Sequence, residues 1–133
     1  MITTYEEYLH TECSLTLEKM QDIHNKMISD IGTDADAIEI YGELVDTATK
    51  YAAIRTEWLL LNREEKAERD SKRTSCHYSI IIKFNMLARY VRMQGKDATW
   101  RDCLGYEEDN PYNRKRMGDF ACYLAFVNGL NAR

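Results

Sequence analysis

Residues 75–94 read Ser-Cys-His-Tyr-Ser-Ile-Ile-Ile-Lys-Phe-Asn-Met-Leu-Ala-Arg-Tyr-Val-Arg-Met-Gln, and this stretch decides the fold class. Seven of its side chains recur at every third or fourth position, which is the period of one helix face. They are His77, Ile80, Ile81, Phe84, Leu87, Ala88 and Val91. Four more apolar residues lie on other faces, namely Tyr78, Ile82, Met86 and Met93. A helix that is apolar around most of its girth is typical of the centre of a fold.

Two long helices are predicted before this segment. The first spans residues 4–31, with capping-box spacing at its start and Gly32 positioned to end it. The second begins at Thr33 or Asp34 and keeps its apolar period as far as Leu61. We expect these two helices to pair with each other as a long hairpin.

The next segment, residues 62–74, is almost entirely polar, and opposite charges recur four positions apart in it. Spacing of this kind supports a helix that projects from the body, but the same composition also suits a flexible link. The sequence leaves both interpretations open.

Two more helices are predicted after residue 95. A short one covers residues 99–104, and a longer one begins at Asn110-Pro111, where asparagine is a favourable cap and proline fits the first helical position. The whole chain of 133 residues contains one proline and six glycines, so it has few turns. We therefore predict a single all-α domain over residues 1–133, an antiparallel helical bundle of four main helices plus one short helix.

The charge is divided unevenly along the chain. Residues 1–70 carry 16 acidic and 7 basic side chains, whereas residues 71–133 carry 6 acidic and 11 basic ones. Opposed halves of this kind attract each other, either within one chain or between two copies. Acidic residues near the start, with no long apolar run, predict neither a signal peptide nor a membrane span, so we expect a cytoplasmic protein.

Four carboxylates form a row on one face of the second helix, namely Asp36, Glu39, Glu43 and Asp46. Oxygen ligands of this type suit Mg²⁺. The row resembles the metal-binding helices of the all-α nucleoside-triphosphate pyrophosphohydrolases of the MazG-like group, which implies Mg²⁺-dependent nucleotide hydrolysis. Those enzymes collect acids from two neighbouring helices, whereas residues 76–94 contain none, so Asp119 or an acid of the first helix would have to complete the site. The alternative is a solvated acidic face near a helix N-terminus.

A second candidate metal site is the motif Glu7-x-x-His10, with His24 and Cys13 on nearby turns. Di-iron bundles need this motif twice together with two further glutamates, and the chain has one copy. Surface histidines with ordinary hydrogen bonds are the interpretation that we favour. No glycine-rich phosphate loop and no nucleophile paired with a base is apparent in the sequence.

Basic and aromatic residues gather in the second half of the chain. They are Arg89, Arg92, Lys96, Trp100, Arg101, Arg114, Lys115 and Arg116. Guanidinium groups beside aromatic rings suit phosphate contacts and base stacking, so this patch predicts an acidic partner, with nucleic acid as one form of it. The net charge of −4 argues against a dedicated nucleic-acid domain, and pairing with the chain's own acids or those of a second copy is the other hypothesis.

We predict a non-enzymatic protein-interaction or regulatory module, because no set of catalytic residues is apparent in the sequence. The two halves of the chain also carry opposite net charge, and its nine tyrosines are of a residue type common in interfaces. We expect its partner to be a protein, including a second copy of itself in a homodimer. Small acidic helical proteins of this type are typical of bacteria and phages. The Mg²⁺-dependent hydrolase and the nucleic-acid-binding protein are the two alternatives.

Overall fold

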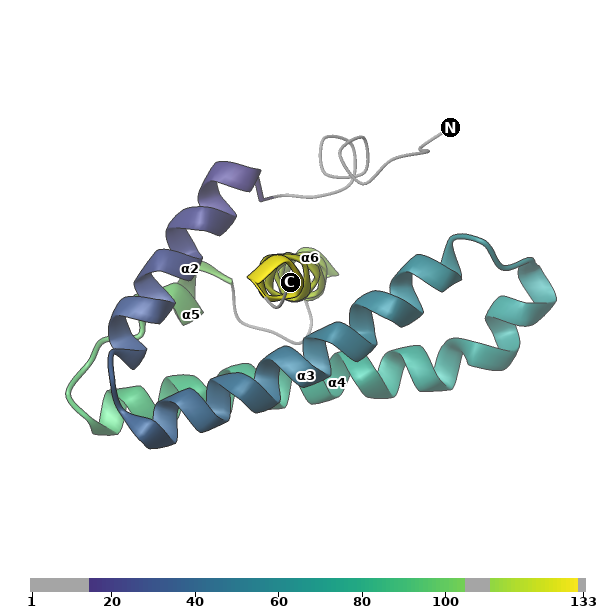
Figure 1. The fold of residues 1–133 in the computed structure, drawn as a ribbon. Helices are drawn as coiled ribbons and strands as arrows, with labels where there is room; N and C mark the ends of the chain where they lie inside the picture. The colour runs from purple at the N-terminus through teal and green to yellow at the C-terminus, as the bar shows by residue number, and fades with distance from the viewer. Residues whose placement is uncertain (1–14, 105–110, 132–133) are drawn as a thin grey trace.

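The computed structural model describes residues 15–104 and 111–131, which form five helices and, within these ranges, no strand (Figure 1). The helices are α2 (Leu17–Ile31), α3 (Ala35–Trp58), α4 (Arg63–Met93), α5 (Thr99–Cys103) and α6 (Pro111–Asn131). The predicted all-α fold is confirmed. None of these helices is both long enough and apolar enough to cross a lipid bilayer.

The framework of the fold is a long antiparallel hairpin of α3 and α4 (Figure 1). At the end of the hairpin opposite the α3–α4 turn, the Tyr90 hydroxyl donates to Asp34, which caps α3, at 2.8 Å. Further along, Lys83 Nζ lies 3.7 Å from a carboxylate oxygen of Glu43. The prediction that the first two long helices pair was wrong, because α2 packs mainly against α5 and touches α6 instead. An apolar stripe shows which face is buried but not which helix covers it.

The polar segment after residue 61 is helical and belongs to α4. Asn62 caps the helix: its Oδ1 accepts from the Glu65 N–H at 2.9 Å, and its own N–H donates to Glu65 Oε1 at 3.0 Å. This capping box satisfies two backbone donors and starts the helix at Arg63, twelve residues before the expected start at Ser75. The projecting helix, rather than the flexible link, is therefore what the structure contains.

Helix α2 begins later than the sequence pattern predicted. Thr16 has extended backbone angles and its hydroxyl oxygen accepts from the Lys19 N–H at 3.1 Å, so Thr16 is the cap and residues 15–16 are not helical. A continuous helix over residues 4–31 is thus wrong at this point, and its expected first part, including Thr4, lies outside the described residues. The end of the helix was predicted correctly, since Gly32 has a φ of 55° there.

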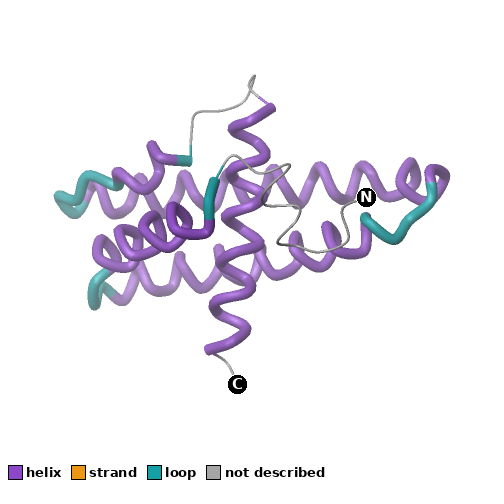
Figure 2. The backbone as a smooth tube through the Cα atoms, turned by 90° about the horizontal axis from the view of Figure 1, so that it is seen from above, coloured by secondary structure: helices purple, strands orange, loops and turns teal. Residues whose placement is uncertain are grey.

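Helix α6 crosses the hairpin near its middle, as the view from above shows (Figure 2). The rings of Phe84 and Phe120 lie 5.9 Å apart between α4 and α6, and both are fully buried. On the α3 side, a Cβ built at Gly118 would lie only 2.7 Å from the Tyr51 hydroxyl. Glycine therefore permits a close approach of α6 to α3 that a side chain would obstruct.

One end of the hairpin is covered by α2 and α5. Trp100 of α5 is fully buried in the same core as Met20 and Met27 of α2. A polar network ties α2, α3 and α6 together nearby: His24 Nε2 and the Tyr41 hydroxyl share a hydrogen bond of 2.9 Å, and Asn128 Nδ2 donates to the same hydroxyl at 3.1 Å. The opposite end of the hairpin has no such cover from the described helices (Figure 1).

Replacing Phe84 by alanine tests the hairpin–α6 contact. Removal of a fully buried ring leaves a cavity, so we expect Phe84→Ala to lower the free energy of unfolding by about 3–5 kcal/mol in urea denaturation. Met86, two residues away, is 42% exposed, and Met86→Ala should cost less than about 1 kcal/mol. Equal losses in the two variants would contradict the assignment of the buried face of α4.

The His24 network predicts a pH dependence of stability. Burial lowers the pKa of His24 below its usual value of 6.5. The unfolded chain therefore binds this proton more readily than the folded one, and the neutral imidazole stabilises the fold fully above pH 6.5. This contribution is lost as the pH falls through the lowered pKa of the folded state. Urea denaturation of the native chain and of His24→Gln between pH 7.5 and 5 should show a shallower decline for the variant, and parallel declines would contradict the prediction.

Candidate functional site at the hairpin tip

The turn between α3 and α4 exposes apolar side chains at the uncovered end of the hairpin. Leu59 is 69% exposed and Leu60 is 83% exposed, the largest value among the large apolar residues described. Two backbone hydrogen bonds fold the turn back on the end of α3, from Leu60 N–H to Glu57 O at 2.9 Å and from Leu61 N–H to Trp58 O at 3.2 Å. We call Trp58 and residues 59–61 the hairpin tip.

Two cations of α4 hold the indole of Trp58. The guanidinium carbon of Arg73 lies 4.5 Å from the ring centroid, and Lys66 Nζ lies 6.0 Å from it. Cation–π contacts at partly exposed sites contribute about 0.5–1 kcal/mol each. Together with the capping box at Asn62 they fix both ends of the turn, so the two exposed leucines stand on an ordered base.

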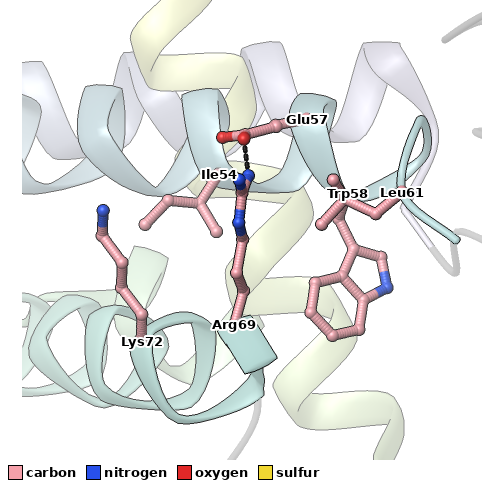
Figure 3. Close-up of a pocket in the computed structure, with 6 residues that line it drawn as sticks. All are labelled: Ile54, Glu57, Trp58, Leu61, Arg69 and Lys72. Atoms are coloured by element: carbon pink, nitrogen blue, oxygen red, sulfur yellow. Dashed lines mark ion pairs between the residues drawn. The ribbon is translucent and has the colours of Figure 1, made fainter. Parts of the chain in front are cut away.

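A shallow pocket of about 290 Å³ lies beside this turn, between α3 and α4. Ile54, Glu57, Trp58, Leu61, Arg69 and Lys72 line it (Figure 3). Arg69 rises from α4 to form an ion pair with Glu57, with Ile54 and Lys72 on one side of it and Trp58 and Leu61 on the other (Figure 3). The pocket therefore combines the apolar side chains of Ile54, Trp58 and Leu61 with the charged groups of Glu57, Arg69 and Lys72.

The side chains that line the pocket include two cations, Arg69 and Lys72, and one acid, Glu57. Two further cations of α4, Lys66 and Arg73, lie against the ring of Trp58. One cation is neutralised by Glu57. Apolar side chains that protrude beside such cations are suited to a partner that combines an apolar recess with carboxylates.

The carboxylates predicted as a metal site lie in the first half of α3, away from the hairpin tip. Asp36, Glu39, Glu43 and Asp46 are all exposed along α3. Glu43 pairs with Lys83 of α4, and the Tyr90 hydroxyl lies 3.5 Å from Asp36 Oδ2. Asp119, considered as a further ligand, is fully buried in α6 and bound to Arg55 at 2.5 Å. Within the described ranges, no three His, Cys, Asp or Glu side chains come together as metal ligands do.

Three residues of the second predicted metal motif, Glu7, His10 and Cys13, lie outside the described residues, and the fourth, His24, is described. His24 is half-buried and hydrogen-bonded to Tyr41, and its ring also meets that of Tyr123 edge-on at 5.9 Å. In the described part of the chain, His24 thus helps to join three helices.

Only some residues of the predicted basic patch are exposed at the surface. Arg89 and Lys96 are exposed, but Trp100 and Arg101 are buried, so these two pack the body of the protein and are unavailable for stacking on a partner. Arg101 Nε donates to Asn85 Oδ1 at 2.8 Å and thereby links α5 to α4. The sequence predicts that Trp100 and Arg101 lie in an exposed binding patch, but the structure buries both. Spacing along the sequence does not show whether a tryptophan points outward or inward.

Of the remaining cations of that patch, Arg92 has partners within the chain and Arg116 is half-buried on α6. Arg92 is held by Asp102 at 3.2 Å and by the carbonyl of Asp97 at 3.2 Å. The side chains of Arg114 and Lys115 lie outside the described part of the chain. The structure therefore gathers Arg89, Arg92 and Lys96 near the end of α4 and shows no continuous basic face among the described side chains.

Comparison with protein-family models, with curated proteins and with solved structures found no match for this chain. Sequence reasoning missed the hairpin tip, although two signals mark it: four consecutive apolar residues, 58–61, precede a polar run, and Asn62 and Glu65 have capping-box spacing.

The cap of α4 offers a test of the ordered tip. We expect Asn62→Ala to cost about 1 kcal/mol in urea denaturation and to speed amide hydrogen exchange at residues 63–66, because the Glu65 amide loses its acceptor. Asn62→Asp keeps an acceptor oxygen at the cap, as a carboxylate in place of the amide, and should retain native protection. If Asn62→Ala exchanges as slowly as the native chain, the cap does not order this turn.

Proposed function

We propose that this protein is a non-enzymatic protein-interaction module, and that it engages its partner with the hairpin tip. The observation that carries the proposal is the exposure of Leu59 and Leu60 on an ordered turn at the uncovered end of the hairpin. Mobile chain ends often expose apolar residues without consequence, but here the capping box and the Trp58 contacts fix the turn. A fixed apolar protrusion loses little entropy when it binds, which favours affinity.

The proposed partner is a protein surface with an apolar recess bordered by carboxylates. The leucines would fill the recess, while Lys72 and its neighbours beside the pocket would meet the acids. Full burial of one leucine side chain contributes roughly 1.5–3 kcal/mol, so two provide a useful anchor. A regulatory role in the cytoplasm of a bacterium, or in a phage, is the setting that we propose from the composition.

The magnesium-dependent hydrolase receives less support. Its candidate ligands form a row on a single helix, and α4 beside them contributes Lys83 rather than an acid to that region. The nucleic-acid alternative loses the buried pair Trp100 and Arg101. At the tip, Trp58 already has cations against its ring, which restricts base stacking on that indole.

A tip variant tests this proposal. In affinity purification from host lysate, quantitative mass spectrometry measures how much partner each bait retains. We expect the double variant Leu59→Ser/Leu60→Ser to retain at least tenfold less partner than the native chain. Leu17→Ser changes a leucine of 52% exposure at the start of α2 and serves as the matched control. Both substitutions alter exposed side chains, so unfolding free energies should change by less than about 1 kcal/mol.

Two further measurements fix the chemistry of the partner. Lys72→Glu should weaken the recovery of the same protein, and added salt should reduce recovery by the native chain, because exposed charge pairs are screened. Equal recovery by the native chain and the double-serine variant would overturn the proposal. Recovery that disappears after nuclease treatment would favour the nucleic-acid alternative instead.

A further inference from the structure

A second surface, separate from the hairpin tip, lies on the outer side of α4. Four of its apolar side chains are exposed, at 66% for Tyr78, 44% for Ile82, 42% for Met86 and 74% for Met93. They are spaced by four, four and seven residues, so they form one row along the helix. We call them the apolar row. The sequence pattern had indicated a helix buried around most of its girth, whereas the structure covers only one of its two apolar faces.

The acidic row of α3, Asp36, Glu39, Glu43 and Asp46, is exposed on the same side of the hairpin. The core residues of α3, such as Leu44 and Ala48, and those of α4, such as Phe84, face the body that contains α6. The exposed rows therefore point away from α6. Figure 1 shows α2, α5 and α6 on one side of the hairpin and no described helix on the other.

Arg89 brings a positive charge to the apolar row, and the acidic row offers the opposite charge, since residues 35–49 of α3 contain four acids and no base. Three other basic side chains of α4 have contacts within the chain: Arg73 lies over Trp58, Lys83 pairs with Glu43, and Arg92 pairs with Asp102. Arg89 is exposed within the apolar row, between Met86 and Met93. Tyrosine, methionine and arginine, which make up most of this row, are residue types enriched in protein interfaces.

Gly42 supplies an independent observation in the middle of the acidic row. Glycine destabilises a helix interior relative to alanine. A Cβ built at Gly42 would meet no atom within 4 Å, so no close packing inside the described chain requires a glycine there. An exposed glycine between Glu39 and Glu43 does leave a flat place on which a side chain from another molecule can rest.

We infer that a second copy of this chain covers this face, with the acidic row of each copy on the apolar row of the other. A two-fold axis parallel to the hairpin exchanges α3 and α4 and keeps each residue at its own level. Within one chain Tyr90 lies level with Asp34 and Asp36, and Lys83 lies level with Glu43. In the dimer, Arg89 therefore lies opposite Asp36 and Glu39 of the second copy, and Ile82 lies close to its Gly42.

The two-fold symmetry makes both contacts twice, as an isologous interface requires. The apolar row consists of four side chains on each copy, whereas each partner in a stable complex buries roughly 800 Å² over some 20–30 residues. We therefore expect a reversible dimer whose population rises with protein concentration and falls with added salt, because its charge pairs are near solvent.

Sedimentation velocity over a range of concentrations tests the dimer. The native chain should sediment increasingly as a dimer, and Ile82→Glu/Met86→Glu should remain monomeric at concentrations at which the native chain is mostly dimeric. Gly42→Gln should also remain monomeric while its unfolding free energy is unchanged or higher, since glutamine favours the helix. A merely structural role of Gly42 would not give this combination.

A charge exchange tests the register. Glu39→Arg and Arg89→Glu should each weaken the dimer at least tenfold, and the doubly substituted chain should recover most of the affinity because both pairs are restored in reverse. Leu59→Ser/Leu60→Ser should dimerise like the native chain, so the outcome is distinguishable from that for the tip. A native chain that stays monomeric at all concentrations, a double variant as weak as the singles, or loss of the dimer in the tip variant would each overturn the inference.

Discussion

The carboxylate of Asp119 is fully buried, and the arrangement of the helices depends on the arginine that meets it. Arg55 of α3 reaches it at 2.5 Å, and one residue earlier Gly118 brings the backbone of α6 against the Tyr51 side chain. An ionised carboxylate is costly in a protein interior unless a partner compensates it. We therefore expect this pair, in addition to the apolar contacts of Phe120, to specify where α6 crosses the hairpin.

The position of α6 determines which surfaces remain for partners. With α6 across the middle of the hairpin and α2 and α5 at one end, the core is complete without the hairpin tip or the outer side of α4 (Figures 1 and 2). These two regions expose Leu60 and Met93, which no folding requirement of the described chain explains. The proposed docking tip and the inferred dimer face therefore have one feature in common, which is exposed apolar side chains held in ordered positions.

Helix type and most helix ends follow from the sequence, whereas pairing and orientation do not. Gly32 and Asp34 mark ends that the structure confirms, because caps act through local backbone geometry. The start of α4 at Asn62 has an equally local cause, but the polar residues that follow gave no apolar period to support it. That α2 packs on α5 instead of α3, and that Trp100 turns inward, depends on contacts between distant segments, which periodicity along one helix does not encode.

The most direct test of this account is a double-mutant cycle on Arg55 and Asp119, measured by urea denaturation. If the pair fixes α6 on the hairpin, Arg55→Leu should lower the unfolding free energy by about 3–5 kcal/mol, because it leaves the buried Asp119 carboxylate without its main partner. Asp119→Leu should cost less, because the side chain of Arg55 is 17% exposed and retains access to water. The double variant should then lose clearly less than the two single losses combined. Losses that simply add would mean that the two side chains act independently and that the crossing of α6 is fixed by other contacts.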